Sequence, residues 1–238
     1  EAVIHCAAYT NVDAAEADPS RAYAVNAAGT QNVAAACLDI GAKMVYVSTD
    51  YVFDGRSREA YREFDTPCPI NVYGWSKLGG EVLARQTLNR LFIARTSWLY
   101  GEGANFIRTM LAMGRHRNIL QVVDDQFGCP TYAEDVAEIL LRLVETDSYG
   151  IYHVANRGHT SWHGLASRIF TLAGMHHMEI QPVTSAEFSR PALRPAYSVL
   201  GSVMLENVLG SSMRSWEDAL RDYLAAEGCL KGQEGRAG

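Results

Sequence analysis

The sequence predicts an α/β protein with a doubly wound parallel sheet and a smaller α+β lobe, and three observations support this fold class. Short apolar segments, rich in β-branched and aromatic residues, alternate with helical patterns over roughly the first 155 residues. These segments lack a strict alternation of polar and apolar residues, which is typical of strands covered on both faces. Their order of strand, helix, strand, helix, strand implies parallel strands joined by right-handed crossovers. Together these observations indicate a Rossmann-like sheet.

The first helix and the strands around it carry clear local signals. An alanine-rich stretch predicts a helix from Ser20 to Ile40. Asp18 can cap this helix, Pro19 suits its first turn, and Gly41 is placed to end it. A second helix is predicted around Ser76–Gln86. The strands are predicted at Ala2–Ala7, Met44–Ser48, Leu91–Arg95 and Ile151–Ala155.

The regular alternation of strand-like and helical segments changes after Tyr100, where the smaller lobe is expected to begin. The polar tail at 231–238 is expected to be disordered. Between Tyr100 and this tail, the sequence predicts a helix over Phe106–Met113 and then a strand at 121–123. It also predicts a helix with Asp135 and Glu138 near its start, and a final helix over Ser215–Ala226 that is capped by Ser215.

The composition narrows the class of protein. A chain of 238 residues with 48% hydrophobic and 20% charged residues is ordinary for a globular protein with a full core. The formal charge of −6 argues against a broad nucleic-acid surface, which needs clustered Lys and Arg. No apolar run approaches the roughly 18 residues of a membrane span, and the first residues lack the basic region of a signal peptide.

The cysteines indicate a reducing compartment. Their number is odd and no C-x-x-C pair is present, which favours a cytoplasmic protein over a disulfide framework. Buried free thiols are expected for all five, which are Cys6, Cys37, Cys68, Cys129 and Cys229.

The sharpest local signal for chemistry is Tyr73-Gly-Trp-Ser-Lys77. Tyr and Lys four residues apart share one face of a helix. A phenol with an ordinary pKa near 10 is a poor acid at neutral pH, and a nearby ammonium lowers that pKa toward the range that acid-base catalysis needs. The same Lys can hydrogen-bond the ribose hydroxyls of a dinucleotide. By itself the pair could also be an ordinary exposed Tyr and Lys.

Thr49 strengthens the catalytic interpretation. It follows the strand predicted at Met44–Ser48, at the carboxyl end where parallel α/β sheets place their sites. A Thr hydroxyl there can donate to a substrate carbonyl while Tyr73 delivers a proton. The alternative is a capping residue at a strand-to-loop junction.

These motifs belong to a set of longer runs that extends from residue 2 to about residue 225. The runs are VIHCAAYTNVDAAE (3–16), YAVNAAGTQNVAAA (23–36), VYVSTDYVFDG (45–55), NVYGWSKLGGE (71–81), IARTSWLYG (93–101), VVDDQFGCPTYAEDVAE (122–138) and RPALRPAYSVL (190–200). In these runs the chain resembles the extended short-chain dehydrogenase/reductases and, within them, the dTDP-4-dehydrorhamnose reductases. The resemblance implies that hydride from NADPH or NADH reduces the 4-keto group of dTDP-4-dehydro-L-rhamnose to give dTDP-L-rhamnose.

The resemblance also implies roles for individual residues. Tyr73 would be the proton donor, with Lys77 binding the nicotinamide ribose and lowering the phenol pKa. Thr49 and Asp50 would contact the sugar. The other residues given roles are Trp98 in the sugar pocket, Ala7, Ala8 and Tyr9 beside the cofactor, and Asn26 as a looser match to a catalytic Asn.

Contacts to the nucleotide diphosphate are expected from polar residues of the second lobe. Arg makes bidentate contacts to phosphate oxygens, and a solvated basic turn is the alternative for such residues. The candidates are Asn105, Arg115, Arg117, Arg190 and Arg194.

One expected motif is missing. A dinucleotide-binding sheet opens with a strand, a Gly-rich turn and a helix whose N-terminus meets the pyrophosphate. No G-x-G-x-x-G follows an early strand here. We therefore expect a fold that is incomplete at the N-terminus, and a chain that binds NAD(P)H poorly or not at all. Residues 1–103 would hold the remaining dinucleotide-binding domain, with 151–155 returning to its sheet, and 104–238 would form mainly the substrate lobe.

Other functions stay open at this stage. An epimerase or dehydratase of the same superfamily would share Tyr73 and Lys77, and a non-catalytic regulatory subunit could resemble the reductase. His159 and His163 have the spacing of two metal ligands on a helix, but without a third ligand we expect no metal site. His5 is expected to be a hydrogen-bonded core residue. The family suggests a homodimer, and no nucleic-acid or membrane partner is expected.

Overall fold

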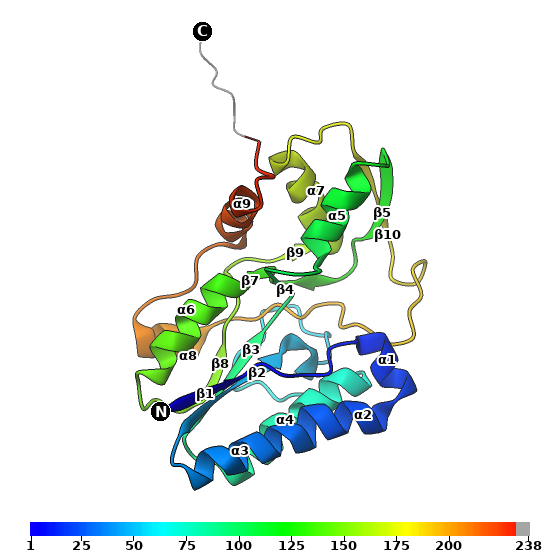
Figure 1. Cartoon of the computed structure of the whole chain (residues 1–238). Coiled ribbons are helices and arrows are strands. Elements are labelled where there is room, and N and C mark those ends of the chain that lie inside the picture. Colours follow the sequence, from blue (N-terminus) through cyan, green and yellow to red (C-terminus); the bar gives the residue numbers. More distant parts are fainter. Residues whose placement is uncertain (232–238) are drawn as a thin grey trace.

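The computed structural model describes residues 1–231, and most of the tail that was expected to be disordered lies outside these described residues. Four parallel strands form the main sheet in the order β1-β2-β3-β8 (Figure 1). They are β1 (Ala2–His5), β2 (Lys43–Thr49), β3 (Leu91–Thr96) and β8 (Gly150–His153). The fold is therefore α/β with a parallel sheet, as the sequence predicts.

Helices cover both faces of this sheet, and the side chains of successive strand residues point to opposite faces. Met44 and Tyr46 pack with α3 (Thr30–Asp39) and α4 (Val72–Thr87). Val45, between them, packs toward the other layer. That layer contains α6 (Ala133–Val144) and α8 (Val203–Leu209).

The helix predicted from Ser20 to Ile40 is confirmed as one unbroken helical run from Pro19 to Asp39, with a π-helical turn inside it. Its parts are α2 (Pro19–Tyr23), the π-helical turn at Ala24–Gly29, and α3. The predicted start is confirmed, since Asp18 accepts a hydrogen bond from the Arg21 N–H and Pro19 occupies the first turn. A π-turn frees carbonyls from the regular ladder, and π-turns often mark functional sites. Here the Asn26 carbonyl accepts hydrogen bonds from Thr30 and Tyr46.

Two further helices, α1 and α4, differ from the sequence prediction. α1 (Val12–Ala17), capped by Asn11, was not predicted. α4 begins at Val72, four residues before the predicted Ser76, because Asn71 caps it by accepting from the Gly74 N–H at 2.7 Å. Gly74 is required at its position, since a Cβ there would collide with the Tyr51 carbonyl. This contact brings the start of α4 against the segment that follows β2.

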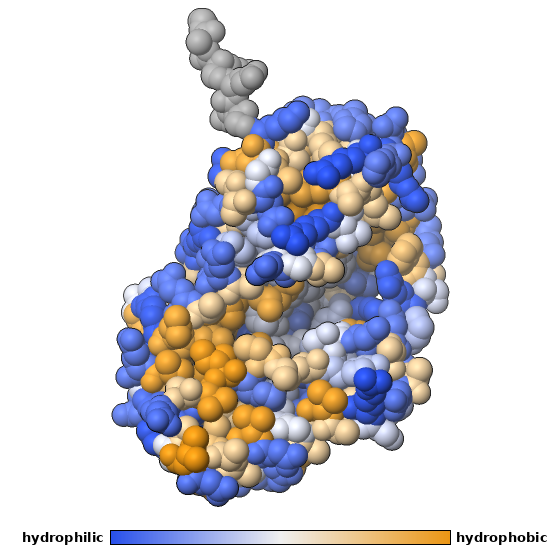
Figure 2. Space-filling model, viewed as in Figure 1, coloured by the Kyte–Doolittle hydropathy of each residue, from blue (hydrophilic) through white to orange (hydrophobic). Residues whose placement is uncertain are grey.

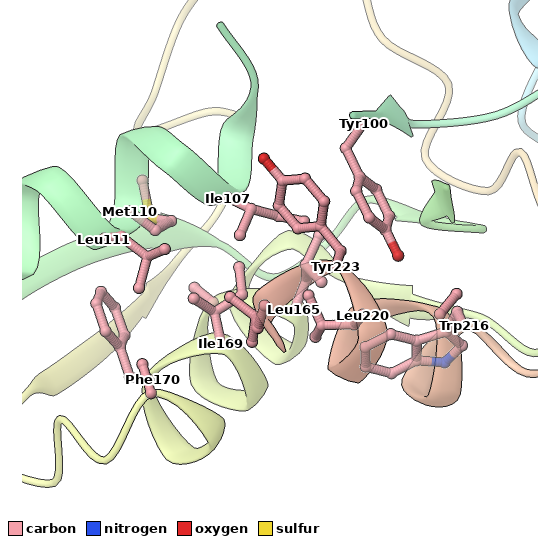
Figure 3. Packing of buried hydrophobic residues seen from close by; sticks show 14 of the residues in the cluster. Tyr100, Ile107, Met110, Leu111, Leu165, Ile169, Phe170, Trp216, Leu220 and Tyr223 are labelled. Atoms are coloured by element: carbon pink, nitrogen blue, oxygen red, sulfur yellow. The ribbon is translucent and has the colours of Figure 1, made fainter. Parts of the chain in front are cut away.

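A second lobe stands on the sheet domain and has its own core (Figures 1 and 3). β5 (Ile119–Val123) and β10 (Glu179–Val183) form a parallel pair. β10 was not predicted because it contains Pro182, which a two-stranded sheet tolerates at its edge. The core residues come from α5 (Phe106–Gly114), α7 (Trp162–Leu172) and α9 (Trp216–Ala226).

Short strand pairs connect the two lobes. β4 (Leu99–Tyr100) pairs with β7 (Thr131–Tyr132), and β6 (Phe127–Gly128) pairs antiparallel with β9 (Thr160–Ser161). The final helix begins as predicted, with Ser215 accepting from the Asp218 N–H.

The expectation of five buried thiols is wrong for two cysteines. Cys37 and Cys129 are buried and Cys229 is half-buried, but Cys6 and Cys68 are exposed. All five are free thiols. Between residues 1 and 231 we find no helix with the length and apolar character needed to cross a membrane.

Candidate active site

The candidate catalytic residues meet at the carboxyl end of β2. Thr49 ends this strand, and Tyr73 lies in the first turn of α4, where its phenol is close enough to the Thr49 side chain for Thr49 to affect the phenol pKa. The ring of Tyr51 lies edge-on to that of Tyr73, with the centroids 5.7 Å apart. Burial raises the pKa of Tyr73 to about 12, while the Thr49 side chain acts to lower it. The phenol therefore holds its proton at neutral pH.

Lys77 lies one turn beyond Tyr73 and is buried. Its ammonium donates to the Val47 carbonyl at 2.7 Å and sits 4.1 Å from the centroid of the Tyr46 ring. Burial lowers the pKa of Lys77 to about 8, and the Glu81 carboxylate opposes that shift. The expected lowering of the Tyr73 pKa is not observed, because burial dominates at the phenol and the ammonium is directed to Val47.

Asp50 is the centre of a buried group of hydroxyls. Its carboxylate accepts hydrogen bonds from Thr49 at 3.1 Å, from Ser97 at 3.0 Å and from Ser198. Burial raises the pKa of Asp50 to about 6, against the effect of these three hydroxyls. Ser97 and Ser198 were not singled out from the sequence, although both stand in runs that carry the family resemblance. In this structure the Thr49 hydroxyl is therefore directed at Asp50, which is itself buried.

Trp98 is held in an unusual backbone conformation. Among residues 1–231 it is the one non-glycine residue with a positive φ, at 44°. Its indole stacks on that of Trp162, with ring centroids 3.5 Å apart and planes 7° apart. A Cβ at Gly128 would collide with the Trp98 indole, so a glycine is needed there. Strained conformations of this kind persist where the surroundings hold them in place. Trp162 was missed by the sequence analysis.

The segment expected beside a cofactor follows β1. Ala7 is exposed, and Ala8 and Tyr9 are half-buried. Asn26 holds this segment, because its side chain accepts from the Tyr9 N–H at 2.7 Å and donates to the Tyr9 carbonyl at 3.1 Å. The same amide donates to Ser76 on α4 at 2.9 Å. Asn26 therefore ties the end of β1 to the catalytic helix.

A cavity of about 810 Å³ opens beside this site, and Figure 2 shows the surface hollowed between the two lobes. Tyr51 is the residue that joins the cavity to the catalytic group, since Tyr73 does not line it. Arg117, Arg190 and Arg194 line it, as expected for three of the four candidate arginines. The other residues of its wall are mainly apolar or amide side chains from α5, β5 and the segment around Gln181 and Phe188.

Asn105 is placed differently from the other candidates. Its side-chain oxygen, Oδ1, caps α5 by accepting a hydrogen bond from the Arg108 backbone N–H at 3.0 Å. Its amide donates to the Gly101 carbonyl at 2.7 Å and to the Tyr223 hydroxyl at 2.9 Å. These bonds use the side chain to hold the helix that lines the cavity.

The histidines do not form a helical pair. α7 begins at Trp162, so His159 precedes the helix, where its ring packs near Phe127. His163 bonds to the Ile180 carbonyl at 3.1 Å. Over the described range 1–231, no three His, Cys, Asp or Glu side chains are grouped to hold a metal ion. His5 lies 3.2 Å from the Thr30 hydroxyl, and burial lowers its pKa.

Comparisons with known proteins show the family to which this chain belongs. The family model described as "RmlD substrate binding domain" matches residues 1–229. The chain is 42% identical to dTDP-4-dehydrorhamnose reductase of Mycobacterium tuberculosis, over 95% of this chain and 77% of that protein. It is 43% identical to the spore coat polysaccharide biosynthesis protein SpsK of Bacillus subtilis, over 93% of this chain and 78% of that protein.

A solved structure is also similar over most of its length. The crystal structure of dTDP-4-dehydrorhamnose reductase from Bacillus anthracis, in complex with NADP, superimposes with a TM-score of 0.92 at 45% identity. The match covers 94% of this chain and 80% of that one. From the family match, the identities and the shared fold, the chain belongs to the RmlD substrate-binding-domain family, that of the dTDP-4-dehydrorhamnose reductases among the extended short-chain dehydrogenase/reductases.

Proposed function

We infer that this chain reduces the 4-keto group of dTDP-4-dehydro-L-rhamnose to give dTDP-L-rhamnose, with NADPH or NADH as the hydride source. The named reductase relatives and the neighbour solved with NADP support this function. The observation that carries it is the meeting of Thr49 and Tyr73 at the carboxyl end of β2, next to a cavity of about 810 Å³. A homodimer is part of the proposal and rests on the family alone, whereas a cytoplasmic location rests on the free cysteines.

Tyr73 is proposed as the proton donor. The bound nicotinamide supplies the hydride to the carbonyl carbon, and the oxygen that becomes a hydroxyl needs one proton. The neutral phenol of Tyr73 carries that proton at pH 7, and because burial raises its pKa to about 12, release of the proton depends on groups that stabilise the phenolate. Thr49 has one hydroxyl proton, which it directs to Asp50 at 3.1 Å. Turning this proton toward the substrate oxygen would polarise the carbonyl before transfer.

The cofactor is proposed to lie beside the segment that follows β1. Ala7 is exposed and Ala8 is half-buried, both side chains are small, and Asn26 fixes the neighbouring Tyr9. The Lys77 ammonium has three N–H donors, and the bond to Val47 uses one of them. The other two are available for ribose hydroxyls. Lys77 would also stabilise the phenolate that forms on Tyr73.

The sugar is proposed to lie between Tyr73 and Trp98, with Asp50 acting through the Thr49 hydroxyl. The nucleotide would extend past Tyr51 into the cavity, where Arg117, Arg190 and Arg194 lie. Asn105 would support this wall through its cap on α5.

A turnover assay tests the proposal and separates the alternatives. Because the chain without a Gly-rich turn is expected to bind NAD(P)H poorly, the assay uses the chain joined at its N-terminus to a strand, a Gly-rich turn and a helix. This protein is mixed with dTDP-4-dehydro-L-rhamnose and NADPH or NADH, and NAD(P)H oxidation and product are both measured. A reductase gives dTDP-L-rhamnose in amounts equal to the NAD(P)H consumed. An epimerase or dehydratase changes the sugar without net consumption of NAD(P)H. A regulatory subunit does neither, and either of these two results would reject the reductase.

A further inference from the structure

Helix α1 meets both the catalytic helix and the loop that carries two arginines of the cavity. Glu16 on α1 accepts a hydrogen bond from the Val72 N–H at 2.9 Å, at the residue that precedes Tyr73. Asn71, the cap of α4, donates to the Leu193 carbonyl at 2.8 Å. Three segments that are distant in the sequence are thus joined next to the catalytic phenol.

Asp13, one turn before Glu16 on α1, holds the arginine loop. Its carboxylate accepts two bonds from the Arg194 guanidinium, at 2.6 and 2.8 Å. It also accepts from the Ala192 N–H at 3.2 Å and lies 3.5 Å from the Arg190 guanidinium. Bidentate pairs of this kind fix the plane of the guanidinium as well as its position.

The arrangement leaves cationic groups directed at the cavity. Arg194 has five N–H donors, of which two bind Asp13 and one donates to the Ala192 carbonyl at 2.7 Å. Two donors remain. The Arg190 side chain is 52% exposed and makes one long contact to Asp13, so most of its donors are also available. One carboxylate cannot neutralise two guanidinium groups, so the pair keeps a net positive charge.

The charge of the cavity fits an anionic ligand. Within the described part of the chain, the residues that line the cavity include three arginines and no aspartate or glutamate. This contrasts with the formal charge of −6 for the whole protein. A wall with an excess of fixed cations concentrates anions in the space beside it.

We propose that Asp13 is a positioning residue that presents Arg194 and Arg190 to the diphosphate of the nucleotide sugar. The proposal rests on the proposed function for the identity of the ligand. Asp13 holds Arg194 and Arg190 at the wall of the cavity before the ligand binds. Much of the conformational entropy of these two long side chains is therefore already lost in the free protein and is not lost again on binding. Because Glu16 fixes the same helix to the start of α4, the diphosphate would be held at a set distance from Tyr73.

Binding of dTDP alone, measured by calorimetry, tests this role without any need for turnover. Asp13→Ala and Asp13→Asn should each weaken dTDP binding about tenfold, which corresponds to about 1.4 kcal/mol. Thymidine, which lacks the diphosphate, should bind both variants as it binds the wild type. In the Arg194→Ala background, Asp13→Ala should have little further effect, since non-additivity reports that one residue acts through the other.

A matched control is available in Glu227→Ala. Glu227 makes a bidentate pair with Arg108, at 2.9 and 2.8 Å, and neither residue lines the cavity. This variant should bind dTDP with wild-type affinity. Wild-type or tighter dTDP binding by both Asp13 variants, fully additive losses in the double variant, or no dTDP binding by the wild type would each overturn the proposal. Failure of the proposed reductase function would give a different result, in which the wild type binds dTDP but shows no turnover in the reductase assay.

Discussion

Tyr73 and Lys77 lie one helical turn apart, and burial moves both of their pKa values toward the neutral side chain. The pKa of Tyr73 rises to about 12 and that of Lys77 falls to about 8. Desolvation disfavours whichever form is charged, so a phenol and an amine shift in opposite directions. The pair is suited to deliver a proton at neutral pH, since the phenol is protonated and the ammonium still carries its charge.

In the version that carries a Gly-rich turn at its N-terminus, Tyr73→Phe should lose most of kcat and leave KM for the nucleotide sugar nearly unchanged. The phenol oxygen supplies its proton chiefly in the transition state, so its loss should appear in the rate. General acid catalysis is typically worth about 10²–10⁴-fold. Steady-state kinetics of the two proteins measure both constants. A variant within a factor of a few of the wild-type kcat would remove Tyr73 from the role of proton donor.

The pH–rate profile should be bell-shaped, with limbs near pH 6 and pH 8. Above about pH 8 Lys77 loses its proton and can no longer stabilise the phenolate. Below about pH 6 Asp50 gains a proton and no longer accepts from all three hydroxyls, so Thr49 loses its orientation. Profiles of kcat/KM from pH 5 to 10 check both limbs. Asp50→Asn should remove the acid limb only, and a flat wild-type profile across pH 7–10 would contradict the role of Lys77.

At the scale of elements, the site depends on how short segments hold large side chains. The turn after β3 places Trp98 at φ 44°, and this conformation is supported from two sides. Gly128 on β6 leaves room for the indole, and Trp162 at the start of α7 stacks on it. Trp162 also lines the cavity, so the stack joins the proposed sugar pocket to the proposed nucleotide site.

Trp162→Leu should raise KM for the nucleotide sugar by roughly 2- to 12-fold, because an aromatic pair is worth about 0.5–1.5 kcal/mol beyond its buried area. Trp162→Phe should recover much of this loss. The near-ultraviolet circular dichroism of the stacked indoles should disappear in the Leu variant. Trp75→Leu is the control, since that side chain is 47% exposed on α4. An unchanged KM together with an unchanged dichroism spectrum would exclude a role for the stack.

At the scale of the whole molecule, a buried polar group joins distant segments of the chain. His153 is on β8, and its Nδ1 atom lies 3.1 Å from the Tyr61 carbonyl oxygen and 2.9 Å from the Gly201 carbonyl oxygen. Arg95 and Glu81 form a buried ion pair nearby, with the closest atoms 2.7 Å apart. Such groups must keep their partners, because removing one partner of a buried pair leaves an uncompensated charge.

His153 should make the protein sensitive to acid. Burial, together with the Arg95 charge, lowers its pKa to about 3, whereas in the unfolded chain it is near the ordinary 6.5. As pH falls through 6.5 the unfolded chain binds a proton that the folded chain does not. The stabilising contribution is therefore complete above about pH 6.5 and is lost as pH falls toward 3.

Urea unfolding at pH 7.5 and pH 5 measures this difference. His153→Gln should be less stable at pH 7.5 and should lose less stability between the two pH values than the wild type. The exposed His116→Gln is the matched control and should keep the wild-type difference. An equal pH dependence in all three proteins would show that His153 does not cause the acid sensitivity.

The sequence by itself determined the features that depend on neighbouring residues. Apolar runs located β2 and β3, and side chains that can accept from the next turn located the caps at Asp18 and Ser215. The spacing of Tyr73 and Lys77, and the place of Thr49 at the end of a strand, predicted the group that is proposed to be catalytic. Each of these signals lies within a few residues of the chain, where periodicity and capping chemistry act directly.

Only the tertiary structure decided which distant side chains complete the site. Ser97 and Ser198 reach Asp50 across 47 and 148 residues of sequence, and Arg194 reaches Asp13 across 181. No local pattern encodes such pairs, because they exist only after the sheet and the second lobe have packed together. The pKa of Tyr73 shows the same division: the sequence supplied a lysine one turn away, but the direction of the shift was set by burial, which is a property of the folded chain.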